Sequence, residues 1–459
     1  MSFSREVAPI IQKRCVGCHG ERVSLGGYRA HTFQAFARPG ASRQPTLVVG
    51  KAAVSRLYQL ITAKGAARMP KNDDPLTTEQ ISLVRRWIDE GAKFDGADPS
   101  AALGSLLGPR QHPASPAAYR MPVPVLSLAL APGGKELLTG GYYEVNVWNP
   151  ATGALIRRLQ HLPQRIQALC YAPDGKQLLV AGGTPGEYGE VTIADPATGA
   201  RSRVLDTFPD IVLAAAFSQD GKLVAAGGAN AEVRVYEVAS GKRLWSSKVH
   251  SDWVTGVSFS PDGRFLASSG RDTTVKVYEV KDGGLFTTYT GHNRNFGKYR
   301  GQFAVNAVRF TGDQLTACSA GGPVLQLWDP LKASLENGTA ADMEERFAKE
   351  SHARFIEHGF TKEVFALQVR GGQAFAASAD GSVKQFDLTT LKAVRTYPGF
   401  TDWAFGLDFD PASHLVAAGS YAGEVRVWNT ETGAPVVTFK AQPGVLKATA
   451  TAPVKAAIR

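Results

Sequence analysis

Hydrophobic residues follow two different spacings along this chain, and the change between them falls near position 123. In the first hundred residues, apolar side chains recur every three or four positions, which is typical of amphipathic helices. This spacing predicts helices over residues 3–14 and 55–61, and a third with its apolar face at Ile81, Val84, Trp87 and Ile88. Thr77 followed by Gln80 is typical of an N-cap, and Gly91 is where the third helix should stop.

From residue 123 onward, short apolar runs repeat. Each copy has an apolar run, a turn, a second apolar run ending in Gly or Ser, and alternating residues that close on an aromatic. Turns such as Asp174-Gly175 and Asp262-Gly263 predict hairpins between the first two runs. The copies are about 40–45 residues apart, which is typical of four-stranded propeller blades. They begin near Val125, Ile166, Ile211, Val254, Val305, Val364 and Ala404, so we expect an all-β propeller with seven blades.

The aromatic positions of these copies resemble those of WD repeats. The Trp-Asp position of that family is matched by Trp148-Asn149, Trp328-Asp329 and Trp428-Asn429, with substitutes at Tyr236, Tyr278 and Phe386. Gly291-His292 matches the family's Gly-His pair. The resemblance covers residues 123–440 and implies a WD-repeat propeller. It is looser in the second copy, where Ile193-Ala194-Asp195 lacks the aromatic.

Residues 99–122 separate the two patterns and are rich in alanine, glycine, serine and proline. The prolines exclude a long helix or a central strand, so a semi-extended linker is expected. We therefore predict a small all-α domain over residues 1–98, a linker over 99–122, the propeller over 123–440 and a tail over 441–459. A chain of 459 residues is also too long for one ordinary core.

The strongest chemical signal is the run Cys15-Val16-Gly17-Cys18-His19. Two cysteines three positions apart, followed directly by a histidine, are the attachment signature of a c-type haem. Both sulfurs can form thioethers with one porphyrin, and His19 can ligate its iron. A redox dithiol or half a zinc site has the same cysteine spacing. However, the adjacent His19 disfavours the dithiol, and no further cysteine occurs before Cys170. We expect one covalent haem c.

Met69 is the expected sixth ligand of the haem iron. It is the only methionine between Met1 and Met121, and it lies in a polar loop of Gly, Pro and Lys residues. A thioether suits ferrous iron and raises its potential relative to a second histidine. The alternatives are His31 and an open sixth position.

Residues 1–98 also resemble the short cytochrome c domain common in planctomycete-type proteins. The resemblance rests on ordered motifs at residues 3–10, Val49-Gly50-Lys51, residues 55–58, Arg68-Met69-Pro70 and residues 76–92. It implies His19 and Met69 as the axial pair. One departure is Lys71, where the family often has a second proline after the methionine, and this affects loop stiffness more than ligation.

Positive charge is concentrated in the first 98 residues. They hold 15 Lys and Arg against 9 Asp and Glu, a surplus of six within a whole-chain net charge of +10. We expect this charge to steer an acidic redox partner, through Lys13, Arg14, Arg22, Arg68 and Lys71 near the haem and through Arg294, Lys298 and Arg300 in an inserted loop of the propeller. The alternative is a solvated surface with some charges on the haem propionates. No Lys/Arg run or recognition motif indicates nucleic acid.

A second insertion predicts a helix over residues 340–351, and no part of the propeller contains a catalytic constellation. Its histidines are dispersed, and His250 is expected to form hydrogen bonds within its own repeat. We therefore predict an electron-transfer cytochrome whose propeller docks a partner, a periplasmic redox enzyme. The alternative is an oxidoreductase in which the propeller pocket holds a substrate or second cofactor and the haem relays electrons.

The expected location is the periplasm or another exported site. Covalent haem attachment normally takes place outside the cytoplasm, so we expect that a signal peptide has been removed. No apolar run is long enough to span a bilayer. The two remaining cysteines, Cys170 and Cys318, lie in apolar runs and are expected to be buried thiols.

Overall fold

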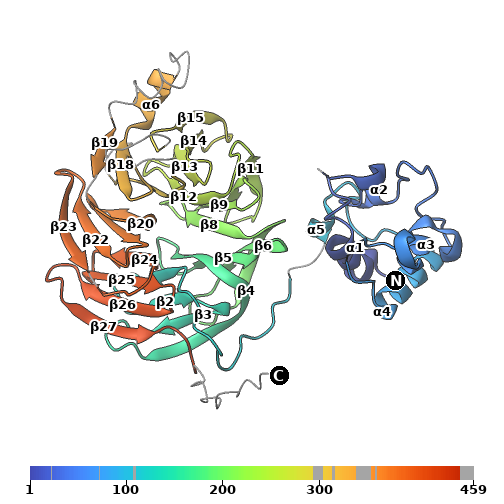
Figure 1. Cartoon of the computed structure of the whole chain (residues 1–459), viewed down its shortest axis with the longest axis horizontal. Coiled ribbons are helices and arrows are strands. Elements are labelled where there is room, and N and C mark those ends of the chain that lie inside the picture. The colour runs from blue at the N-terminus through green and yellow to red at the C-terminus, as the bar shows by residue number, and fades with distance from the viewer. Residues whose placement is uncertain are drawn as a thin grey trace, which may run out of the picture. The chain divides into compact units, whose positions relative to one another are not determined.

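The computed structural model divides the chain into two compact units, Met1–Gln111 and His112–Arg459. The structure describes residues 1–21, 23–71, 73–106, 110–292, 303–312, 316–337, 353–356, 359–397 and 399–444. The first unit is helical and the second consists mostly of β-strands (Figure 1). This order confirms the prediction of a small helical region followed by a mostly-β region.

Short helices build the first unit: η1 (Phe3–Val7), α1 (Ala8–Arg14), η2 (Leu25–Gly27), α2 (Phe33–Phe36), η3 (Ala52–Val54), α3 (Arg56–Thr62), η4 (Gly65–Ala67), α4 (Thr78–Asp89) and α5 (Leu103–Leu106). η1 runs directly into α1, so residues 3–14 are helical throughout, as predicted. The capping box at α4 is also confirmed, because Thr77 Oγ1 accepts from Gln80 N and Gln80 Oε1 accepts from Thr77 N. Ser55 precedes α3, but its hydroxyl accepts from Val48 N at 2.8 Å rather than capping the helix.

Phe3 lies at the centre of the helical core. Its ring is fully buried, with centroids 4.7 Å from Phe33 and 5.2 Å from Trp87. Trp87 belongs to α4, so this contact joins the first helical stretch to the last long helix. Burying an aromatic side chain of this size stabilises a fold by roughly 1.5–3 kcal/mol. The packing therefore fixes the helix that leads into the Cys15–His19 run.

The segment 99–122, predicted as a linker, is divided between the two units. Leu103 in α5 is fully buried in the helical core. Further along, His112, Ser115 and Tyr119 are buried within the β unit, where Ser115 and Tyr119 donate hydrogen bonds to Glu144. Both parts of the segment therefore pack against folded structure, each within its own unit.

The β unit contains one sheet of seven strands and five sheets of four. The first sheet holds β1 (Leu128–Leu130), β2 (Leu137–Gly140), β3 (Tyr142–Trp148), β4 (Leu155–Tyr171), β5 (Leu178–Thr184), β6 (Tyr188–Ala194) and β7 (Arg201–Phe208). The next two hold β8 (Val212–Phe217), β9 (Leu223–Gly228), β10 (Val233–Glu237), β11 (Arg243–Ser247), and β12 (Val254–Phe259), β13 (Phe265–Gly270), β14 (Val275–Glu279), β15 (Leu285–Tyr289).

The remaining three sheets follow the same antiparallel order. They hold β16 (Val305–Phe310), β17 (Ala317–Gly321), β18 (Val324–Trp328), β19 (Arg354–Ile356); β20 (Val364–Arg370), β21 (Gln373–Ser378), β22 (Val383–Asp387), β23 (Lys392–Tyr397); and β24 (Ala404–Asp410), β25 (Leu415–Ser420), β26 (Glu424–Asn429), β27 (Pro435–Lys440). A helix, α6 (Pro330–Asn337), follows β18. The helix predicted over 340–351 and the basic residues of the inserted loop lie outside the described residues.

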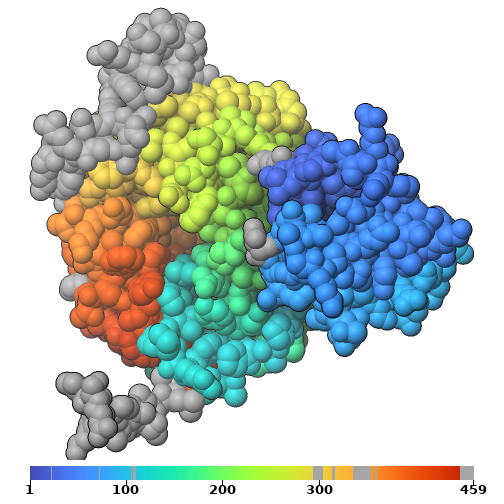
Figure 2. Space-filling view, turned by 45° about the vertical axis from the view of Figure 1, so that its right-hand side comes forward, coloured from blue at the N-terminus to red at the C-terminus, as the bar shows by residue number. Residues whose placement is uncertain are grey.

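The inner strands of the sheets follow one another in a closed cycle. β1 packs on β4, which packs on β8, and the series continues through β12, β16, β20 and β24 back to β1. β4 is long enough to take part twice, pairing with β3 through its first half and with β5 through its second. In Figure 2 the segments of the β unit follow the colour sequence from cyan to red as successive sectors.

The cycle is closed by hydrogen bonds between residues far apart in the sequence. Val125 N donates to Ser420 O at 3.0 Å, and Val125 O accepts from Gly406 N at 3.1 Å. Gln442 Nε2 donates to Val123 O at 2.6 Å. Side chains of Val125 and Leu128 also share a buried cluster with Val425 and Val427. The beginning and the end of the β unit are therefore held together by both backbone pairing and apolar packing.

Candidate haem site

The Cys15–His19 run forms a helical turn directly after α1. Cys15 N donates to Ile11 O at 2.9 Å, and His19 N donates to Cys15 O at 2.9 Å. Cys18 N also donates to Cys15 O, at 3.2 Å. Both thiols and the imidazole thus come from one continuous turn, which the buried helix η1–α1 holds in place.

His19 has a ring nitrogen without a partner. Its Nδ1 atom is buried and forms no hydrogen bond within the described residues. Tyr28 packs edge-on against the imidazole, with ring centroids 5.2 Å apart, and its own hydroxyl donates to Phe36 O at 2.9 Å. Since buried polar atoms are rarely left unpaired, this nitrogen is consistent with a histidine whose ring is meant to interact with a bound group.

The two thiols differ in environment. Cys15 packs against the helical core, and burial raises the pKa of its thiol to about 12. Cys18 is exposed, and neither cysteine is part of a disulfide. A neutral thiol at Cys15 is compatible with a thioether bond, which is itself uncharged. The residues present therefore fit a covalently attached c-type haem: Cys15 and Cys18 would hold it, and His19 would supply an axial nitrogen.

Met69 and His31 both remain as candidates for the sixth ligand. Met69 is half-buried, and its backbone N donates to Leu60 O at 3.0 Å, which ties its loop to α3. His31 is also half-buried, and its Nδ1 is a second buried nitrogen without a partner in the described part of the chain. Its carbonyl accepts from Leu103 N at 2.8 Å. The choice of Met69 remains a prediction.

The basic residues near this site fall into two groups. Arg14 and Arg68 are turned toward the loop after Met69, where Arg14 contacts Asp73 and Arg68 Nη2 donates to Asp73 O at 2.9 Å. Lys13 and Lys71 are exposed. Arg22, Arg294, Lys298 and Arg300 lie outside the described residues. Of the predicted docking cations that are described, two also hold the Met69 loop.

The β unit contains the hydrogen-bond network expected around His250. Its Nδ1 lies 2.9 Å from Asp272 Oδ2, and its Nε2 lies 2.7 Å from Ser268 Oγ, which in turn donates to Tyr278 Oη at 3.4 Å. Burial alone would raise the pKa of Asp272, but the hydrogen bond and charge of His250 lower it well below its ordinary value. The prediction that His250 has a structural role is confirmed.

Sequence reasoning did not identify the residues that line the central cavity of the β unit. This cavity has a volume of about 890 Å³, and Arg309, Gln368 and Asp408 project into it from adjacent inner strands. Cys170 lines it as well, whereas Cys318 is fully buried in the core as predicted. The signals that could have identified them are the polar residues Arg309, Gln368 and Asp408 within largely apolar strands.

Comparisons with known proteins identify both parts of the chain. The family described as Planctomycete cytochrome C matches residues 15–73, and the family described as WD domain, G-beta repeat matches residues 202–237, 241–279 and 391–429. A human kinesin-like protein, KIF21A, is 30% identical over 84 residues, which are 18% of this chain and 5% of that protein. The Cys15–His19 turn and Met69 lie within the segment that matches the cytochrome family. The His250 network lies within a segment that matches the WD family. The chain therefore combines a segment similar to planctomycete-type cytochrome c domains with segments similar to WD repeats.

Proposed function

We propose that this protein is an electron carrier with one covalent haem c, whose β unit docks a redox partner protein. In this proposal Cys15 and Cys18 form the thioether bonds, and His19 and Met69 are the axial ligands. The haem, when bound, accepts and releases one electron at a time. The chain's own residues position it, shield it on the core side and hold the loop of the sixth ligand.

The observation that carries the proposal is the single helical turn that presents Cys15, Cys18 and His19, with the buried Nδ1 of His19 unpartnered. Neither a redox dithiol nor half of a zinc site needs a histidine at that position. Tyr28 packs against the imidazole, and the buried residues of α1 hold the turn that carries it. Arg14 and Arg68 restrain the Met69 loop through Asp73.

For the β unit we propose a seven-bladed propeller. Its support is the closed cycle of inner strands, in which β4 serves two neighbouring sets of four strands. Divided at β4, the seven-stranded sheet supplies two blades and the five four-stranded sheets supply the others. Rings of this kind are rigid scaffolds with loops at both faces, and many bind proteins there.

Exposed aromatic side chains support a docking role. Trp253, Trp403 and Tyr421 are 43%, 47% and 54% exposed, although large aromatics usually bury themselves. Trp403 and Tyr421 lie 5.7 Å apart between ring centroids, next to Phe405. Trp253, directly before β12, and Phe405 on β24 both line the central cavity. Aromatic clusters of this kind are common at the centres of protein interfaces.

The partner is proposed to be acidic, because the chain carries a net charge of +10 and the first 98 residues contribute a surplus of six. We also propose an exported, periplasmic location, on the ground that haem is attached to such motifs outside the cytoplasm. None of the described helices is long and apolar enough to cross a membrane.

The proposed cofactor is tested by haem staining of a denaturing gel, together with the reduced-minus-oxidised spectrum of the purified protein. Haem should remain with the polypeptide after denaturation and acid extraction. The variant carrying Cys15→Ala and Cys18→Ala should lose the stain, whereas Cys170→Ala, which removes a thiol from the β unit, should keep it. A protein that releases all of its haem on denaturation would contradict covalent attachment.

A further inference from the structure

Arg309 is a cation of the central cavity that forms no ion pair with any described residue. It lies on β16 and is half-buried among residues that line the cavity. Its Nε donates to Gln368 Oε1 at 3.2 Å and its Nη1 donates to Val308 O at 2.8 Å. In the part of the chain that the structure describes, no carboxylate forms an ion pair with it. Burial and the nearby charge of Arg370 lower its pKa, and the negative charge of Asp408 offsets this only in part.

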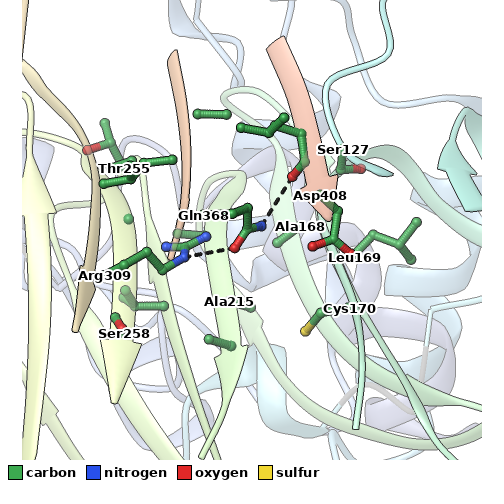
Figure 3. A pocket seen from close by; sticks show the side chains of 18 of the residues that line it. Ser127, Ala168, Leu169, Cys170, Ala215, Thr255, Ser258, Arg309, Gln368 and Asp408 are labelled. Carbon is green, nitrogen blue, oxygen red and sulfur yellow. Dashed lines mark hydrogen bonds between the residues drawn. The ribbon is translucent and has the colours of Figure 1, made fainter. Parts of the chain in front are cut away.

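The acidic residue that lines the cavity is Asp408, which contacts Arg370 and Leu130 but keeps one buried oxygen, Oδ1, without a hydrogen bond among the described residues. Asp408 on β24 lies 3.0 Å from Arg370 Nη2, and its other oxygen accepts from Leu130 N at 3.0 Å. Gln368 lies between Arg309 and Asp408 (Figure 3), and its Nε2 donates to Leu407 O at 3.1 Å. The two arginines and one aspartate leave this part of the cavity with one positive charge that is not neutralised.

An aromatic pair lies on the same two strands as Gln368 and Asp408. Phe365 and Phe405 both line the cavity, and their rings are stacked with centroids 4.4 Å apart. Phe365 is three residues before Gln368 on β20, which corresponds to about 10 Å along a strand. A molecule that contacts both the rings and Arg309 therefore needs an apolar body joined to an anionic group.

We propose that the cavity binds an organic carboxylate, whose carboxyl group pairs with Arg309 and whose apolar body lies against Phe365 and Phe405. A guanidinium with free N–H groups matches a carboxylate in both charge and geometry. A volume of about 890 Å³ is in the range of small-molecule sites, and such sites combine apolar walls with a few polar groups. This site does not depend on the proposed haem.

The same chemistry can come from a free metabolite or from an acidic side chain of a partner protein, and two probes distinguish these sources. The first is 4-phenylbutyrate, with 4-phenylbutyramide as its uncharged control. The second is a short peptide with blocked ends that contains one Phe next to one Glu, with Gln replacing Glu in its control. Binding to the full-length holoprotein is measured by titration calorimetry. In at least one of the two probe pairs, the acid should bind more tightly than its uncharged control.

Arg309→Met should weaken binding of the preferred acid by at least about tenfold and leave the neutral control unchanged, because the charged hydrogen bonds are lost. Arg243→Met, on the outer strand β11, is the matched control and should bind like the wild type. Phe365→Ala should weaken the binding of acid and amide alike.

Thermal melting checks that each variant is folded. If Arg309→Met does not fold and Arg309→Lys does, Arg309→Lys should bind the acid at least about threefold more weakly than the wild type. The reason is that lysine lacks the planar guanidinium, which can donate two parallel hydrogen bonds to a carboxylate. Equal binding of acid and amide, or undiminished binding in a folded Arg309 variant, would overturn the proposal.

Discussion

Arg14 Nη2 lies 3.4 Å from Asp73 Oδ2, which joins the residue directly before Cys15 to the loop that follows Met69. Arg14 also donates to the backbone carbonyl of Asp74. The side chain of Arg14 is largely buried, while that of Asp73 is half exposed. The two segments proposed to contact opposite sides of the haem are therefore connected directly by a side chain as well as through the core.

Replacing Arg14 should loosen the Met69 loop. We expect Arg14→Met to bind added imidazole about two- to tenfold more tightly than the wild type, since a partly exposed ion pair contributes up to about 1 kcal/mol and the bond to the Asp74 carbonyl adds to it. The measurement is an absorbance titration of the oxidised protein. Lys13→Met, which removes an exposed neighbouring cation, should leave the imidazole affinity unchanged. Equal affinities in the wild type and Arg14→Met would show that Arg14 does not restrain the loop.

Met69 and His31 are distinguished by their alanine variants. Met69→Ala should abolish the weak far-red charge-transfer band of iron–thioether ligation and lower the reduction potential, because a thioether favours ferrous iron. His31→Ala, the matched control, should keep the band. Optical spectra and a redox titration of both variants decide the question. The opposite pattern, with Met69→Ala unchanged, would assign the ligand to His31.

Glu190 should make the β unit less stable in acid. Its carboxylate is fully buried, 3.2 Å from His112 Nε2 and 3.1 Å from Arg201 Nη1. Burial by itself would raise its pKa, but the hydrogen bond and charge of His112 lower it below the ordinary 4.5. The unfolded chain therefore binds this proton at higher pH than the folded chain does. The resulting stability is present above about pH 4.5 and is lost as the pH falls further.

This effect is measured by urea unfolding of the full chain between pH 6 and pH 3.5, following the transition of the β unit. Glu190→Gln should cost about 3 kcal/mol at neutral pH and should have a shallower dependence on pH than the wild type. Glu279→Gln, which alters a surface pair with Lys281, should stay within about 0.5 kcal/mol of the wild type. Parallel pH profiles for the wild type and Glu190→Gln would exclude Glu190 as a source of the acid sensitivity.

Gln442 should help to keep the cycle of inner strands closed. Its side chain is buried and donates to Val123 O at 2.6 Å, so Gln442→Ala leaves a carbonyl without this partner. We expect a loss of about 1–2 kcal/mol, seen as a lower melting temperature of the β unit by calorimetry. Gln219→Ala, at an exposed position, is the control and should melt with the wild type. Identical melting of both variants would mean that the backbone pairing of Val125 suffices for closure.

The basic surface of the helical unit should speed the reaction with an acidic partner. Replacing Lys13 and Lys71 together by Gln should slow bimolecular electron transfer to an acidic cytochrome or cupredoxin about two- to fivefold at low salt. Added salt should slow the wild type as well. The measurement is the second-order rate constant as a function of ionic strength, with Lys176→Gln and Lys392→Gln in the β unit as the control pair. A rate that is flat or rises with salt would remove the electrostatic contribution.

Features that depend only on neighbouring residues could be predicted before the structure was known. Cys15, Cys18 and His19 share one turn because they lie within five successive residues directly after α1, and Thr77 caps α4 because Gln80 follows three positions later. The repeated apolar runs likewise determined the strands, since alternation along a strand and tight Asp-Gly turns act locally.

Contacts between residues that are distant in the sequence could be seen only in the folded chain. The pairing of Arg14 with Asp73, the division of residues 99–122 between two units, and the opening of Arg309 into a cavity each depend on how separate elements pack. Local periodicity says which face of a strand is apolar, but it does not say that β16, β20 and β24 lie side by side. The cavity and its unpaired charge exist because these inner strands converge, and that convergence is set by packing between sheets, which no short stretch of sequence encodes.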